Sequence, residues 1–237
     1  MALPSNTSPV YTLRIPSTQK FIKYRPFLVR EEKALLIAQQ SEDPEVMINT
    51  LKAVIVSCVK DDIDADSLAT FDLEYIFTQI RAKSVGEEVE LIFPCNFCND
   101  EKARVKISFD LTKIEVLTPN NHQKKIELYN EVGVVMKYPS INVIQSIESL
   151  NTSDIDAVFS VVAKCIDYVY DGDEIFYAKE QTQKELEEFL NNLTSDQFAK
   201  IQMFFETMPK MRQEVKYTCP CCAAENHTVL EGLAAFF

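Results

Sequence analysis

Two Cys-x-x-Cys pairs, far apart in the sequence, place the strongest constraint on how this chain can fold. The first pair is Cys95 and Cys98, and the second is Cys219 and Cys222. This spacing allows both thiolates of a pair to reach one metal ion, and two such pairs supply the four ligands of a closed tetrahedral zinc site. The sequence therefore predicts a structural Zn²⁺ site that joins these distant segments, with residues 99–218 inserted between its halves.

The second pair leaves some choice of ligand, because Cys219-Pro220-Cys221-Cys222 offers three thiols. The Cys-x-x-Cys spacing favours Cys222 over Cys221. His227 is an alternative ligand, but its position five residues after Cys222 predicts that it lies in the following strand. Redox thiols without a metal remain the alternative to a zinc site. Four protein ligands would leave no coordination position open for a substrate.

Alternating apolar and polar residues flank both pairs, as expected for half-buried strands. The predicted strands are Glu88–Phe93 and Ala103–Phe109 around the first pair, and Glu214–Thr218 and His227–Leu230 around the second. Each pair is thus predicted at the tip of a hairpin, and the two hairpins together would resemble a zinc ribbon.

Helical patterns dominate the rest of the chain. The predicted helices are Val29–Gln40, one that begins at Asp43-Pro44, Leu73–Ala82 with Asp72 as its cap, Ile141–Leu150, Ser153–Tyr170, Thr182–Leu193 and Thr194–Met208. Further strands are predicted at Val10–Ile15, Phe21–Tyr24 and Gly133–Tyr138, and a polar loop at Pro119–Lys125. The predicted fold class is α+β, mainly helical, with a zinc-ribbon-like β element formed by the two distant Cys-x-x-Cys hairpins.

This pattern divides the chain into four parts. Residues 1–85 are predicted to form an N-terminal strand pair and a helical part, and residues 86–110 the first half of the ribbon. Residues 111–212 are predicted to be an inserted, mainly helical part. Residues 213–237 would form the second half of the ribbon and an apolar C-terminal tail.

Composition restricts the function classes. The formal net charge of −12 weakens the inference from a zinc ribbon to nucleic-acid binding and favours protein partners. The chain has 4 glycines and no glycine-rich phosphate loop. Without a signal-peptide pattern or a membrane-spanning run, we expect a reducing, cytoplasmic setting in which thiols bind metal. Cys58 and Cys165 lie in apolar helical patterns and are expected to be core residues.

No catalytic constellation stands out, and the chain is predicted not to be an enzyme. A reactive Cys221 with His227 as its base is the thiol-enzyme alternative. The C-terminal tail carries Leu233, Phe236 and Phe237, which are predicted either to pack on the core or to dock into a partner.

Several further segments are distinctive as a set: Tyr24-Arg25-Pro26-Phe27, Glu31-Glu32-Lys33, Phe71-Asp72-Leu73-Glu74-Tyr75, Arg81-Ala82-Lys83-Ser84-Val85-Gly86, Phe204-Phe205-Glu206-Thr207-Met208-Pro209, the two cysteine pairs and the terminal Gly232–Phe237 segment. Together they resemble the T4-type phage baseplate protein family, which contains the baseplate hub assembly proteins. The resemblance covers roughly residues 10–237.

The resemblance implies a non-enzymatic phage tail protein that binds hub or tape-measure proteins while the baseplate hub is assembled. It implies a location in the host cytoplasm during assembly and in the tail baseplate of the virion. A transient tail assembly chaperone, absent from the mature particle, is the first alternative. A nucleic-acid-binding zinc ribbon is the second. The resemblance carries over no catalytic residues.

Overall fold

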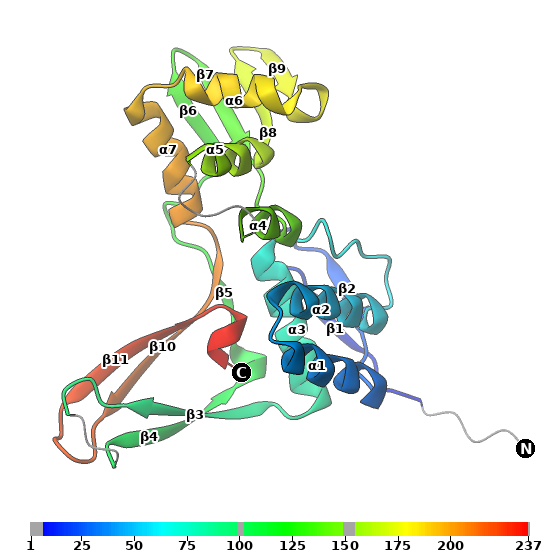
Figure 1. Ribbon diagram of the computed structural model, residues 1–237, viewed down its shortest axis with the longest axis vertical. Helices are drawn as coiled ribbons and strands as arrows, with labels where there is room; N and C mark the ends of the chain where they lie inside the picture. The colour runs from blue at the N-terminus through cyan, green and yellow to red at the C-terminus, as the bar shows by residue number, and fades with distance from the viewer. Residues whose placement is uncertain (1–6, 99–101, 149–154, 237) are drawn as a thin grey trace, which may run out of the picture. The chain divides into compact units, whose positions relative to one another are not determined.

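The computed structural model describes residues 7–98, 102–148 and 155–236 (Figure 1). The chain divides into two compact units, which are described separately below. Unit 1 comprises Met1–Ala65, Phe71–Leu117 and Lys210–Phe237, and unit 2 comprises Asp66–Thr70 and Thr118–Pro209. Among the described helices, none combines the length and the apolar character needed to cross a bilayer.

The prediction of a mainly helical fold is wrong. The structure is 39% helix and 30% strand, and its described residues form seven α-helices and eleven strands in four sheets. Part of the difference lies within residues 111–212, which were predicted to be mainly helical but also contain a four-stranded sheet. Of the four strands of this sheet, the sequence predicted one, at Gly133–Tyr138.

Unit 1 begins with a hairpin and three helices. Strands β1 (Tyr11–Arg14) and β2 (Phe21–Tyr24) pair in antiparallel fashion, and the helices are α1 (Val29–Ser41), α2 (Pro44–Cys58) and α3 (Thr70–Ser84). Asp43 caps α2 by accepting a hydrogen bond from the N–H of Glu45, and Pro44 fills the first position, as predicted.

Asp72 does not cap α3, contrary to the prediction. The helix begins at Thr70, and the carboxylate of Asp72 is fully buried. It accepts hydrogen bonds from the backbone N–H of Ser17, at 2.9 Å, and from the Ser17 hydroxyl. Tertiary contact with the β1–β2 turn therefore explains why an acidic side chain is tolerated inside this helix.

The remaining strands of unit 1 form two long hairpins. They are β3 (Glu88–Pro94), β4 (Arg104–Asp110), β5 (Val116–Leu117), β10 (Lys210–Thr218) and β11 (Glu225–Glu231), with short 3₁₀ helices η1 (Leu111–Lys113) and η3 (Leu233–Phe236). One sheet pairs β3 with β4, and the other has the order β11-β10-β5. Their shared core contains Ala82, Phe93, Leu111, Ile114, Met211, Val215, Tyr217 and Leu230.

The chain leaves unit 1 and returns to it at adjacent positions. Leu117 is the last residue of β5 and Lys210 the first of β10, and these two residues are paired in the antiparallel ladder. Unit 2 is thus largely an insertion whose two connections start side by side in one sheet.

Unit 2 is an antiparallel sheet with helices packed on one face. Its strands are β6 (Lys125–Tyr129), β7 (Val132–Met136), β8 (Ile166–Asp171) and β9 (Glu174–Tyr177), in that spatial order. Its helices are α4 (Ile141–Glu148), α5 (Ile155–Lys164), α6 (Gln183–Asn191), α7 (Ser195–Glu206) and the 3₁₀ helix η2 (Ala178–Glu180). Helices α5, α6 and α7 pack their apolar sides, including Phe204 of α7, on the sheet residues Val134, Met136 and Ile166.

The predicted helix Ser153–Tyr170 is wrong in its second half. Helix α5 ends at Lys164, and β8 follows directly after the buried Cys165. The apolar stripe of this segment fits either structure, and its β-branched and aromatic residues favour a strand once β7 is available as a partner. Strand β6 was also missed: its first residue lies in the predicted loop Pro119–Lys125, and no element was predicted for the rest of it.

Candidate metal centre

The tips of the two hairpins bring four cysteines together. The Sγ atoms of Cys95, Cys98, Cys219 and Cys222 all lie within 4.8 Å of one another. Two of the distances run between the hairpins: 3.7 Å from Cys95 to Cys222 and 3.7 Å from Cys98 to Cys219. The structure therefore places all four predicted ligands in one cluster.

The spacing of the sulfur atoms fits a tetrahedral metal site. Zinc–sulfur bonds of about 2.3 Å in a regular tetrahedron put neighbouring sulfurs about 3.8 Å apart. The two inter-hairpin distances agree with that value. This Cys₄ set could therefore hold a metal ion.

Each cysteine pair lies at the end of a hairpin that is closed by a backbone hydrogen bond from its first cysteine. In the first hairpin, the N–H of Cys95 donates to the carbonyl of Ala103 at 3.1 Å. In the second, the N–H of Cys219 donates to the carbonyl of Ala224 at 2.9 Å, and Ala223 adopts a left-handed conformation with φ 59°. These bonds close the hairpins next to the cysteine pairs, whose Sγ atoms meet in one cluster.

Direct contacts join the two hairpins just below their tips. The hydroxyl of Tyr217, on β10, donates to the carbonyl of Pro94, at the end of β3, at 2.6 Å. The ring of Tyr217 also packs on that of Phe93, with centroids 5.4 Å apart. The hairpins thus have a packed contact of their own, beside the cysteine cluster. Figure 1 shows the β3–β4 and β10–β11 hairpins converging toward their tips.

Backbone N–H groups stabilise the thiolate form of two ligands. The N–H of Phe97 points at the Sγ of Cys95, and the N–H of Cys221 at the Sγ of Cys219, each at 3.4 Å. The bond from Phe97 is the largest cause that lowers the pKa of Cys95, to about 6. Hydrogen bonds from the N–H groups of Cys222 and Cys221 lower the pKa of Cys219. Metal ligands must be thiolates, so these donors favour metal binding.

Asn226 is a site residue that the sequence analysis missed. Its side chain is 3% exposed, and its amide nitrogen donates to the Sγ of Cys95 at 3.6 Å. Its amide oxygen accepts from the N–H of Asn96 at 2.9 Å. The available signal was a polar residue at an inward-facing position of β11, on the same face as Leu230.

The family to which the chain belongs follows from comparison with known proteins. The model of a family described as T4 bacteriophage base plate protein matches residues 8–237, nearly the whole chain. The chain belongs to this baseplate family. Neither a curated protein nor a solved structure matches it. The match confirms the resemblance to T4-type baseplate proteins inferred from the sequence.

Membership gives the baseplate protein a place in the phage particle. The family consists of base plate proteins, so the chain has protein partners in the particle and a location in the tail baseplate. A structural baseplate family is consistent with a non-enzymatic role in the tail.

The two spare ligand candidates of the baseplate protein lie outside the cluster: Cys221 is exposed, and His227 faces Glu214 with 3.7 Å between Nε2 and Oε2.

The C-terminal segment of the baseplate protein is described as far as Phe236. Leu233 and Ala235 pack against the core of unit 1, and the N–H of Leu233 donates to the carboxylate of Glu74. Phe237 lies outside the described residues.

Cys58 and Cys165 are fully buried, which confirms that they are core residues, and burial raises their pKa values to about 11 and about 12.

Proposed function

We propose that the chain is a non-enzymatic tail protein that binds hub or tape-measure proteins during assembly of the baseplate hub. Its membership in the baseplate family over residues 8–237 supports this role. The net charge of −12 supports protein partners over nucleic acid. On this proposal, the protein acts in the host cytoplasm while the hub is built.

The second part of the proposal is a structural Zn²⁺ held by Cys95, Cys98, Cys219 and Cys222. The observation that carries it is the gathering of four sulfur atoms within 4.8 Å from segments far apart in sequence. Four thiolates are the ligand set typical of structural zinc. Residues 86–110 and 213–237 would then be the two halves of one ribbon.

Metal analysis of matched variants tests the zinc site. The wild-type protein should contain one zinc per chain, and Cys222→Ser should lose most of it. Cys221→Ser is the matched control, because this neighbouring thiol is exposed and lies outside the cluster. A chelator should lower the melting temperature of the wild type, because metal binding contributes to folding free energy. Equal zinc content in both variants, or an unchanged melting temperature, would contradict the site.

Co-expression with candidate hub and tape-measure proteins, followed by pull-down, tests the assembly role. Stable capture of one of them supports the proposal, and failure with all of them contradicts it. Mass spectrometry of purified tails separates a permanent subunit from a chaperone that leaves before maturation. A nucleic-acid-binding ribbon would instead show DNA affinity that falls steeply with salt.

A further inference from the structure

His122 lies near the start of unit 2, in the connection between β5 and β6. Its backbone N–H donates to the carbonyl of Pro119 at 3.0 Å. The ring is half-buried and lies against two aromatic side chains. Its centre is 5.6 Å from that of Tyr138, with 18° between the ring planes, and 5.1 Å from that of Phe204. The fold therefore places an ionisable ring in an aromatic stack.

Both ring nitrogens of His122 face hydroxyl groups. Nδ1 lies 3.1 Å from Oγ1 of Thr207, and Nε2 lies 3.0 Å from the hydroxyl of Tyr138. The Thr207 hydroxyl donates its one proton to the backbone of α7, at 2.6 Å from the carbonyl of Met203, so it accepts from His122. Nδ1 therefore carries the proton of the neutral ring, and Nε2 accepts from the Tyr138 hydroxyl.

These contacts join the two ends of the inserted segment Thr118–Pro209. His122 comes soon after the start of this segment, and Thr207, the C-cap of α7, comes just before its end. Tyr138 follows β7 and stacks on Phe204 of α7, with ring centres 5.7 Å apart and 16° between the planes. His122 thus ties the entering chain both to the leaving chain and to the end of a central strand of the sheet.

We propose that His122 is a pH-sensitive clamp, whose neutral ring holds the two ends of unit 2 together and whose protonation loosens them. A proton added at Nε2 removes the acceptor of the Tyr138 hydroxyl, which must then turn its own proton elsewhere. The titratable groups that face the ring are Tyr138 and Lys124, whose Nζ lies 4.2 Å from the centre of the Tyr138 ring. Helix α7 presents the uncharged Phe204 and Thr207. The charged ring would thus meet a like charge in a partly buried site.

The electrostatics of the site set the direction of the pH response. Burial and the charge of Lys124 both lower the pKa of His122 below its ordinary value of 6.5. In the unfolded chain, the ring takes up a proton near that ordinary value. A folded-state pKa below the unfolded one contributes stability that is fully present above about pH 6.5 and is lost as pH falls through the folded value. The clamp is therefore closed at neutral pH and loosens in acid.

Nuclear magnetic resonance of the histidine ring tests the hydrogen bonds in the full-length protein. The chain has 2 histidines, so a His227→Ala background leaves one ring to titrate. Tyr138→Phe should raise the pKa of His122, because it removes the donor to the neutral Nε2. Thr207→Val should lower this pKa, because it removes the acceptor of Nδ1–H, whose hydrogen bond is stronger in the charged ring. Both replacements keep the shape of the side chain. A shift of the opposite sign, or an unchanged pKa, in either variant would overturn the proposal.

Hydrogen exchange at the two ends of unit 2 tests the clamp itself. The N–H groups of His122 and Thr207 donate to the carbonyls of Pro119 and Met203. At neutral pH, the Thr207 amide should exchange roughly two-fold to ten-fold faster in His122→Gln than in the wild type, the range that one or two hydrogen bonds contribute. This ratio should fall toward one as pH is lowered below about 6.5, because glutamine does not titrate.

The intrinsic pH dependence of exchange cancels in this ratio, because both proteins are measured at the same pH. Amides of the β10–β11 hairpin in unit 1 are the internal control and should give a ratio near one at every pH. A Thr207 ratio of one at neutral pH would show that His122 does not hold the end of α7. A ratio that stays constant as pH falls would show that the contact does not respond to protonation. Either result would overturn the proposal.

Discussion

The side-chain amide of Asn226 donates to the Sγ of Cys95 while its oxygen accepts from the N–H of Asn96. One buried residue of the second hairpin therefore holds both the ligand and the turn of the first. Groups that hydrogen-bond to metal ligands orient them and tune their affinity for the metal.

Asn226→Ala should weaken zinc binding by about 10-fold to 100-fold, because it removes this support and leaves the N–H of Asn96 without its side-chain acceptor. Competition with a colorimetric chelator measures the change. His227→Ala is the matched control, since His227 is the next residue of β11 and faces outward. Equal affinities for the two variants would show that Asn226 gives the site no support.

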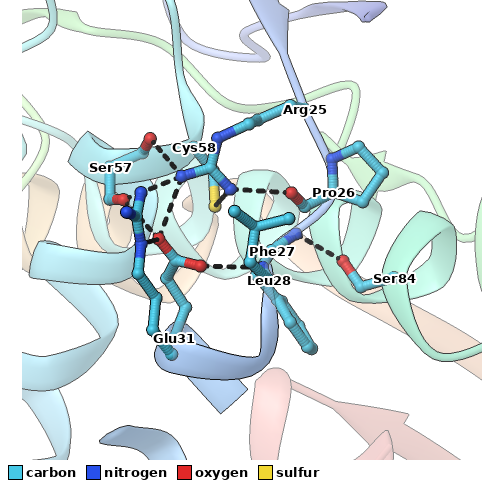
Figure 2. Close-up of polar contacts among 9 residues, drawn as sticks. Arg25, Pro26, Phe27, Leu28, Glu31, Ser57, Cys58 and Ser84 are labelled. Carbon is cyan, nitrogen blue, oxygen red and sulfur yellow. Dashed lines mark hydrogen bonds and ion pairs between the residues drawn. The ribbon is translucent and has the colours of Figure 1, made fainter. Parts of the chain in front are cut away.

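Glu31 is the centre of a buried polar network in unit 1. Figure 2 shows its carboxylate facing Arg25, Ser57 and the backbone of Leu28. The distances are 2.9 Å to Nη2 of Arg25, 2.8 Å to Oγ of Ser57 and 2.7 Å to the N–H of Leu28, and Nε of Arg30 lies 2.7 Å away. The network joins the start of α1 to the end of α2.

Glu31→Gln should lower the free energy of unfolding by about 3 kcal/mol, because it leaves the largely buried guanidinium of Arg25 without its counter-charge. Urea denaturation followed by circular dichroism measures the loss. Glu32→Gln removes an exposed charge at the next position and should change stability little. A similar loss of unfolding free energy in both variants would mean that the change in net charge, and not the loss of the hydrogen-bond network, destabilises the protein.

The same carboxylate should give unit 1 a specific acid sensitivity. Burial alone would raise the pKa of Glu31, but hydrogen bonds from Arg25, Arg30 and Ser57 outweigh it and hold the pKa well below the ordinary 4.5. A lowered folded-state pKa contributes stability above the unfolded value, and this contribution is lost as pH falls through the folded one.

The stability difference between the wild type and Glu31→Gln should therefore be constant near neutral pH and shrink below about pH 4.5. Urea titrations at a series of pH values measure it. A difference that stays constant down to about pH 3 would show that the Glu31 carboxylate is not stabilised in the folded state.

Gly133 occupies a position in β7 with no room for a side chain. A Cβ atom there would collide with the Tyr170 hydroxyl and with the backbone carbonyl of Ile126. Gly133→Ala should destabilise unit 2 by about 1 to 3 kcal/mol, because a backbone atom cannot move aside as a flexible side chain can. Urea denaturation measures this. The zinc content should not change, since the four cysteines belong to unit 1.

Deletion of residues 236–237 tests whether the end of the tail docks into a partner, because Leu233 and Ala235, which pack against the core of unit 1, are retained. If the end of the tail binds a partner, the deletion should reduce capture of that partner in pull-downs and leave the melting temperature nearly unchanged. Leu233→Ala is the comparison variant and should lower the melting temperature, because Leu233 packs against the core of unit 1. Equal loss of binding and stability on deletion would mean that the tail is packed on its own chain.

Local signals in the sequence were sufficient to predict much of unit 1 and the helices that have strong N-caps. Asp43-Pro44 marks the start of α2, and Thr182 and Thr194 each open a helix with a complete capping box. The cysteine spacing identified all four members of the cluster, because a metal site requires specific residue types at specific intervals. These features depend on neighbours in the chain.

Features that depend on distant partners were not predictable in the same way. The apolar pattern of Ile166–Asp171 fits a helix as well as a strand. Its pairing with β7 and β9 in the folded chain makes it a strand. Asp72 resembles a helix cap in the sequence because it directly precedes the predicted helix. Its hydrogen-bond donor in the structure, Ser17, comes from another part of the chain. Asn226 supports a sulfur atom 131 positions away, and no local pattern encodes that contact.

The wide separation of the two cysteine pairs also sets an order of events on the ribosome. Cys98 and Cys219 are 121 positions apart, which corresponds to roughly 6 to 24 seconds of synthesis at ordinary translation rates. A nascent chain therefore exposes one half-site and completes the whole inserted unit before the second half-site emerges. With the proposed zinc site, metal capture by all four thiols would be a late step in the biogenesis of this protein.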